Sequence, residues 1–134
     1  EWEGVGDPLR AKYPLQMNTN HAVQRSHSTF DNIDILREAH HQVAVINSLD
    51  AAARDIKNGD VVHVFNDRGT IEIEARVTPR IRPGCIVVWQ GAWYNPDGNG
   101  IDQGGCANTL TKYQPTPFAK GNPQHTNLVQ VEKV

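Results

Sequence analysis

The sequence lacks several features that would narrow its function at once. No apolar run among its 134 residues approaches the roughly 18 residues needed to cross a bilayer, which argues against a membrane span. The formal net charge of -2 gives no general attraction to nucleic acid or anionic lipid. Any anion that the protein binds must therefore be held by local geometry.

Cysteine and catalytic motifs are scarce as well. Cys85 and Cys106 are too far apart for a CxxC metal or redox motif, so we expect two partly buried thiols, with a disulfide as the alternative. The six histidines lack metal-ligand spacing. No GxSxG, HExxH, GxGxxG or Walker motif occurs, and the adjacent Ser26 and His27 cannot face each other on a strand. No catalytic residue and no metal ligand is predicted.

The length suits one domain, because 134 residues can bury a core without disulfide or metal cross-links. The chain begins with Glu1 rather than Met, and its first twelve residues have little periodicity. We interpret residues 1–12 as a flexible N-terminal lead and residues 13–134 as the domain. The sequence is expected to be a piece of a longer protein.

Hydrophobic patterning predicts a mainly β fold. Apolar runs or alternation indicate six strands, at residues 13–19, 42–47, 60–65, 70–77, 85–90 and 127–134. Helical spacing indicates two short helices, at 30–39 and at 49–56, the second capped by Ser48. The turn NDRG predicts a hairpin in which Gly69 takes a positive φ. Six short strands with long loops favour a closed β-barrel.

Three polar patches, at residues 18–29, 90–109 and 120–127, lie outside this pattern. Their Asn, Gln, Ser and Thr side chains supply mixed donors and acceptors, which suits a large polar ligand. The first patch runs into a predicted helix with Ser28 or Thr29 as cap and Arg25 nearby. This could cradle phosphate oxygens, or it could be an ordinary capped helix after a solvated loop. Trp93 could wall a substrate opening or anchor a turn.

Several segments carry a resemblance to a known family. They are RSHSTFDN, INSLDAAARDIKNGDVVHVFNDRG, VTPRIRPG, QGAWYNPD, GGCANTLT and AKGNPQHTNLVQVEKV. Together they resemble the C-terminal molybdopterin-dinucleotide-binding domain of the dimethyl sulfoxide reductase family, and they are most similar to the catalytic A subunits of its anaerobic members. The resemblance runs from about Tyr13 to Val134.

The resemblance implies a six-stranded double-psi β-barrel that binds one side of bis(molybdopterin guanine dinucleotide) with molybdenum. It places a substrate funnel near Trp93. The family's metal ligand and iron–sulfur motif lie in upstream domains, outside this sequence. The resemblance and the phosphate cradle described above together predict cofactor contacts on three loops. The predicted contact residues are Thr19, Asn20, Arg25, Ser26, His27, Ser28, Thr29, Asn108, Gln124, His125 and Asn127.

The implied parent enzyme would remove oxygen from an S-oxide or N-oxide in anaerobic respiration, as part of electron transport. This domain would position the cofactor, and alone it should be soluble and inactive. The implied partners are the remaining domains of the catalytic subunit, an iron–sulfur electron-transfer subunit and a membrane-anchor subunit, with no nucleic acid. The implied location is the periplasmic or outer face of the cytoplasmic membrane.

Two alternatives remain open from the sequence. The same barrel could belong to another molybdenum or tungsten enzyme, such as a formate or formylmethanofuran dehydrogenase. It could also be a stand-alone barrel that acts as a protein-interaction module through its long loops.

Overall fold

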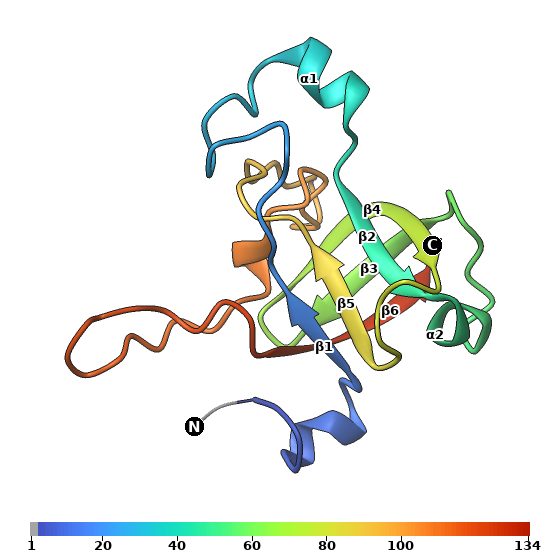
Figure 1. Ribbon diagram of the computed structural model, residues 1–134, viewed down its shortest axis with the longest axis vertical. Helices are drawn as coiled ribbons and strands as arrows, with labels where there is room; N and C mark the ends of the chain where they lie inside the picture. The colour runs from blue at the N-terminus through green and yellow to red at the C-terminus, as the bar shows by residue number, and fades with distance from the viewer. Residues whose placement is uncertain (1–2) are drawn as a thin grey trace.

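The computed structural model describes residues 3–134, so Glu1 and Trp2 of the predicted lead lie outside the described residues. Six strands form a closed barrel in the order β1-β5-β2-β4-β3-β6 (Figure 1). The predicted mainly β fold, a six-stranded double-psi barrel with short helices and long loops, is confirmed. The strands are β1 (Leu15–Asn18), β2 (Val43–Asn47), β3 (Val61–Asn66), β4 (Gly69–Thr78), β5 (Cys85–Val88) and β6 (Asn127–Lys133).

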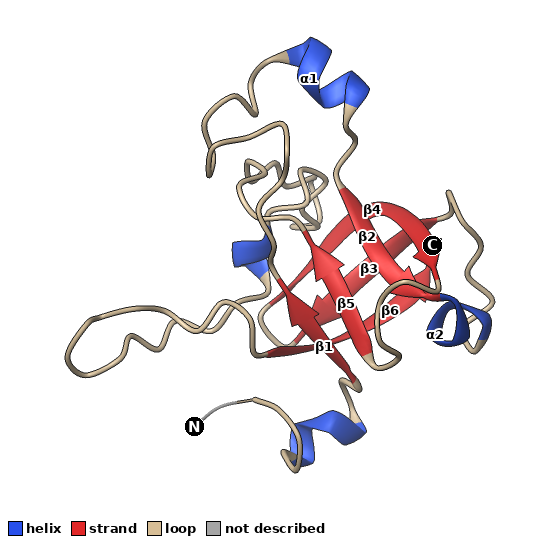
Figure 2. Ribbon diagram, in the orientation of Figure 1, coloured by secondary structure: helices blue, strands red, loops and turns tan. Residues whose placement is uncertain are grey.

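Four helical segments accompany the barrel: α1 (Asp34–Ala39), α2 (Ser48–Ala52) and the 3-10 helices η1 (Pro8–Ala11) and η2 (Ala107–Thr109). Among the described residues, no helix is both long enough and apolar enough to cross a membrane. The loop between β1 and β2, which carries α1, and the loop between η2 and β6 both project away from α2 (Figure 2).

The strand pairing explains why the loops are long. β1 pairs with β5 in parallel and β2 pairs with β4 in parallel, whereas the other four pairings are antiparallel. A parallel pair cannot be closed by a tight turn and needs a crossover connection. The core lies inside the barrel, where alternate strand residues such as Met17, Ile46, Val64, Ile71 and Ile86 have no exposed surface.

The second predicted helix is shorter than expected and has a different cap. Asn47 is the N-cap of α2, and its Oδ1 accepts a hydrogen bond from the Leu49 N–H at 2.8 Å, so the prediction of Ser48 as the cap is wrong. Because α2 ends at Ala52, the predicted apolar face does not form as a unit. Leu49 is 69% exposed, whereas Ile56 packs into the core from beyond the helix.

The predicted hairpin is confirmed, since β3 and β4 pair with Asn66 opposite Gly69. The predicted positive φ at Gly69 is wrong. Glycine is needed there for a different reason: a Cβ atom would lie 2.7 Å from Cγ2 of Thr109. The absence of a side chain at this position lets η2 pack directly on the start of β4.

The described part of the predicted lead, residues 3–12, contacts the barrel. The Glu3 carboxylate accepts hydrogen bonds from Arg68 Nη1 at 2.6 Å and from the Leu128 N–H at 2.8 Å. The Lys12 ammonium lies 2.5 Å from Asp67 Oδ1. The boundary at residue 13 and the flexibility of the lead stay predictions.

Candidate functional site

The first polar loop contains a tight turn where the sequence predicts the start of a helix. The Thr29 N–H donates to the Ser26 carbonyl at 2.9 Å, and His27 and Phe30 have positive φ values of 52° and 77°. Helix α1 begins only at Asp34, and its N-cap residue makes no side-chain capping bond. The prediction that Ser28 or Thr29 caps a helix is therefore wrong. The turn instead leaves residues 26 to 29 exposed to solvent.

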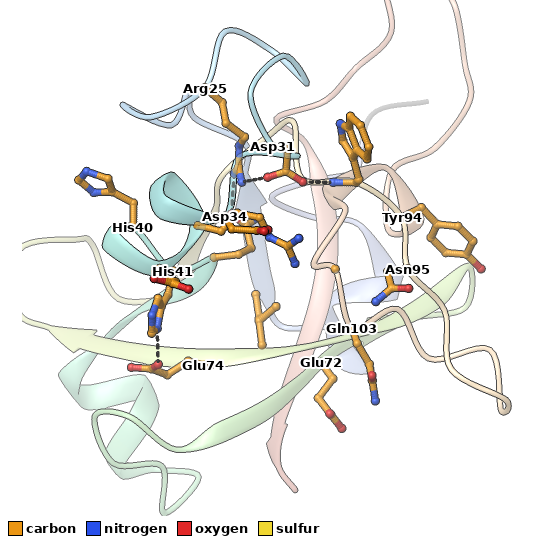
Figure 3. Close-up of a pocket in the computed structure, with 16 residues that line it drawn as sticks. Arg25, Asp31, Asp34, His40, His41, Glu72, Glu74, Tyr94, Asn95 and Gln103 are labelled. Carbon is orange, nitrogen blue, oxygen red and sulfur yellow. Dashed lines mark hydrogen bonds and ion pairs between the residues drawn. The ribbon is translucent and has the colours of Figure 1, made fainter.

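Arg25 holds this loop in place from inside the protein. Its side chain is 3% exposed, and its Nη1 forms an ion pair with Asp31 Oδ1 at 2.7 Å (Figure 3). Its Nη2 donates to Gln42 Oε1 at 2.7 Å, while Asp31 Oδ2 accepts from the Trp93 N–H at 2.7 Å. Both terminal nitrogens of Arg25 are thus committed to protein partners. These bonds give Arg25 a structural role, while its Nε is buried without a hydrogen-bond partner within the described residues, so contact between Arg25 and a phosphate stays a prediction.

The first and second polar patches lie in direct contact. Trp93 Nε1 donates to the Ser28 carbonyl at 2.8 Å, and the Trp93 side chain is still about half exposed. At Gly91, which has a φ of 91°, a Cβ atom would lie 1.7 Å from the His27 carbonyl oxygen. The structure therefore brings His27, Ser28 and Trp93 together. Asn20 joins them through its carbonyl, which accepts from the Gln90 N–H at 3.0 Å.

The first loop also contacts the third. The Thr19 N–H donates to His125 Nδ1 at 3.2 Å, and Thr19 Oγ1 donates to the Gln124 carbonyl at 3.4 Å. Because Nδ1 accepts a backbone hydrogen bond, the ring proton of neutral His125 lies on Nε2. His125 is exposed, so this N–H is a donor available to a ligand.

Asn127 and Asn108 have different roles. Asn127 is buried, with its Oδ1 accepting from the Lys112 N–H at 3.0 Å and its Nδ2 donating to the Gln124 carbonyl at 2.9 Å. These bonds use its amide to shape the third loop, and its direct contact with a ligand stays a prediction. Asn108 lies exposed on η2, and its side-chain amide makes no hydrogen bond within residues 3–134, which leaves it available.

A pocket of about 780 Å³ lies beside α1 and β4, and of the predicted site residues only Arg25 and Trp93 line it (Figure 3). Arg37 adds a second cation to its wall. His41 Nδ1 is 3.6 Å from Glu74 Oε2. The pocket is lined in part by the first and second polar patches, through residues such as Arg25, Trp93 and Asn95, but its carboxylates outnumber its two arginines, which disfavours a phosphate-bearing ligand. Its five carboxylates are those of Asp31, Asp34, Glu38, Glu72 and Glu74.

Three buried amide atoms that sequence reasoning missed bear on what the loops can hold. Gln24 Oε1, Gln90 Nε2 and Gln114 Oε1 are buried and lack a hydrogen-bond partner within the described residues. Buried polar groups are nearly always paired, so these atoms in or beside the polar loops are available to the donors and acceptors of a ligand or of water. Residues 103–131 contain no Asp or Glu, which suits an anionic ligand. These residues fit a phosphate-containing dinucleotide.

The two cysteines are free and partly buried, as predicted. Burial raises the pKa of the Cys106 thiol, so this residue stays protonated at neutral pH. A protonated thiol is a poor nucleophile. Within residues 3–134, no three His, Cys, Asp or Glu side chains gather as a metal site.

Comparisons with known proteins identify a family that matches most of the chain. Residues 15–128 match the family described as "Molydopterin dinucleotide binding domain". The chain is 55% identical over 133 residues to dimethyl sulfoxide reductase DmsA of Escherichia coli (strain K12), covering 99% of this chain and 16% of that protein. It is 40% identical over 131 residues to the dimethyl sulfoxide/trimethylamine N-oxide reductase of Cereibacter sphaeroides, covering 92% of this chain and 16% of that protein.

A solved structure shares the fold. It is acetylene hydratase from Pelobacter acetylenicus, with a TM-score of 0.76 at 17% identity over 95% of this chain and 19% of that chain. At this identity the likeness concerns the fold alone. The chain spans about a sixth of the length of the relatives described above.

Proposed function

Because the chain belongs to the molybdopterin dinucleotide-binding domain family, we propose that its three polar loops bind one side of bis(molybdopterin guanine dinucleotide) within a longer molybdenum oxidoreductase. The observation that carries this proposal is the contact of the loops at two points. Thr19 bonds to His125, and Trp93 bonds to Ser28. Segments more than 60 residues apart in sequence thereby form one polar surface.

The side chains on this surface bind by neutral hydrogen bonds. His27, Ser28 and Asn108 are exposed, and His125 presents its Nε2–H. Such donors can hold phosphate oxygens and pterin edges without a net positive charge. When bound, the cofactor supplies two-electron redox chemistry at molybdenum. The residues of this chain orient it and exclude water from one side.

Beyond the domain itself, we infer an S-oxide or N-oxide reductase as the parent enzyme, since the similar proteins bear those names. The domain alone should be inactive. We further propose that the parent acts in electron transport of anaerobic respiration, on the periplasmic or outer face of the cytoplasmic membrane. Its partners would be the other domains of the catalytic subunit, an iron–sulfur subunit and a membrane anchor.

The test is the double variant His27→Ala, Ser28→Ala in the full-length protein that contains this chain. Both side chains lie on an exposed turn, so cofactor retention should fall while the melting temperature changes little. The measurements are molybdenum and guanine nucleotide per polypeptide. His40→Ala is the matched control, because His40 is an exposed histidine at the end of α1.

Normal molybdenum and nucleotide content in the double variant would contradict the assignment of this loop. Assays with S-oxides, N-oxides and formate separate the enzyme classes. Formate oxidation without oxide reduction would contradict the inferred parent activity.

A further inference from the structure

Residues 111–126, between η2 and β6, form an arm that projects far from the barrel (Figure 1). Hydrogen bonds close its tip. The Thr116 N–H donates to the Gly121 carbonyl at 2.9 Å, and the Lys120 N–H donates to the Thr116 carbonyl at 3.1 Å. Nearer the barrel, the Gln114 N–H donates to Asn122 Oδ1 at 3.0 Å. The arm therefore has a defined shape.

The arm exposes two large aromatic side chains. Phe118, inside the closed tip, is 98% exposed, and Tyr113, near the base, is 88% exposed. Because Phe118 is almost fully exposed, its side chain adds no burial energy to the folding of this domain. Exposed aromatic side chains on an ordered projection can anchor a contact with a partner surface.

The charge of the arm restricts its partner. Residues 111–126 contain Lys112 and Lys120 and no Asp or Glu. The complementary surface should therefore offer an apolar recess for Phe118 with carboxylates near the positions of the two ammonium groups.

The position of the arm and the length of the relatives indicate one binding partner for the arm. The arm contains most of the third polar patch, residues 120–127, and it lies on the side of the barrel away from α2 (Figure 1). The relatives are about six times as long as this chain. A cofactor that these loops hold on one side would be enclosed on its other side by the rest of a longer polypeptide, which would then lie close to the arm.

We propose that the arm docks into another domain of the same longer polypeptide, with Phe118 inserted into an apolar recess rimmed by carboxylates. This contact would fix the barrel over the cofactor. The inference rests on the proposed function for the existence of that longer polypeptide. A second copy of the chain and a separate subunit are the competing occupants, and each predicts a different cross-link.

The first test is photo-cross-linking in the full-length protein, purified from its host. A benzoylphenylalanine probe replaces Phe118, and a matched probe replaces Leu49, which is 69% exposed on α2 at the opposite side of the barrel. Docking predicts cross-links from position 118 to peptides of the same polypeptide outside residues 1–134, with few from position 49. Cross-links to a separate polypeptide, or a yield at position 118 no higher than at position 49, would overturn the proposal.

The second test uses trypsin cleavage after Lys120 in the same full-length protein. Phe118→Ser should speed cleavage by about tenfold, because it raises the population of undocked arm, whereas Phe118→Leu should retain most of the protection. Equal cleavage rates in the unsubstituted protein and the serine variant would refute docking. Molybdenum and nucleotide content is measured on each sample. Absent cofactor with intact cross-links would refute the proposed function and leave the docking contact standing.

Discussion

Removing Arg68 should destabilise the barrel more than removing any exposed ion pair. Arg68 donates two hydrogen bonds to the Glu3 carboxylate, from Nη1 to Oε1 at 2.6 Å and from Nη2 to Oε2 at 3.1 Å. Its Nε donates a third hydrogen bond to the Leu110 carbonyl at 2.8 Å. The Glu3 side chain is 8% exposed and the Arg68 side chain 27%. The substitution Arg68→Met keeps much of the apolar stem but leaves the Glu3 carboxylate buried with the Leu128 N–H as its remaining donor.

The expected cost follows from this geometry. Removing one partner of a buried ion pair costs about 3 to 5 kcal/mol, and the partial exposure of Arg68 places the expectation near the lower end, at about 3 kcal/mol. For a chain of this size, that loss should lower the melting temperature by about 10 °C. Glu3→Gln keeps one acceptor oxygen for Arg68 and should cost about 1 to 2 kcal/mol.

The assay is urea unfolding of residues 1–134, followed by circular dichroism and fluorescence. Lys12→Met is the matched control, because the Lys12–Asp67 pair has side chains 63% and 59% exposed and solvent screens it. An Arg68→Met variant with a free energy of unfolding within about 0.5 kcal/mol of the unsubstituted domain would refute this reasoning.

Two further predictions concern the β3–β4 turn. Gly69→Ala should cost about 1 to 3 kcal/mol in unfolding free energy, because the new Cβ meets Thr109 Cγ2 at 2.7 Å, and Thr109→Ser should recover part of that loss in a double-mutant cycle. The hydrogen bond from Lys12 lowers the pKa of Asp67. The pair therefore stabilises the folded state at pH values above the usual carboxyl pKa near 3.8, and this stabilisation is lost as the pH falls through the lowered pKa. Carboxyl titration by NMR should show Asp67 titrating below its usual range and returning toward it in Lys12→Met, and an unchanged Asp67 titration would contradict the contact.

The barrel strands could be predicted because their signal is local. In β4, Ile71, Ile73 and Ala75 alternate with polar residues, and the structure buries all three on the inner face. Helix caps were harder to assign. Asn47 and Ser48 are adjacent, and both residue types are good N-caps. Asn47 is the cap because β2 ends at this residue and α2 begins at the next one.

The candidate site was predictable as three loops but not in its internal contacts. Nothing near Arg25 in the sequence indicates that Gln42 would share its guanidinium with Asp31. The acidic pocket was missed because its carboxylates come from α1, β4 and the first loop, and no local pattern reports such convergence. The unpaired buried amides of Gln90 and Gln114 depend likewise on packing between distant segments.

The contact at Gly91 has a consequence for how this surface can change. The His27 carbonyl sits where a side chain at position 91 would be, and the Trp93 carbonyl approaches Gly104 in the same manner, 1.9 Å from a Cβ placed there. Main chain thus meets main chain at both points, and neither contact depends on the identity of an exposed side chain. The side chain at position 28 can therefore be exchanged while the backbone beneath it stays in place, whereas His27 holds a φ of 52° and Trp93 Nε1 donates to the Ser28 carbonyl. A library built at position 28, with both glycines left untouched, should yield folded variants that differ in what the surface binds.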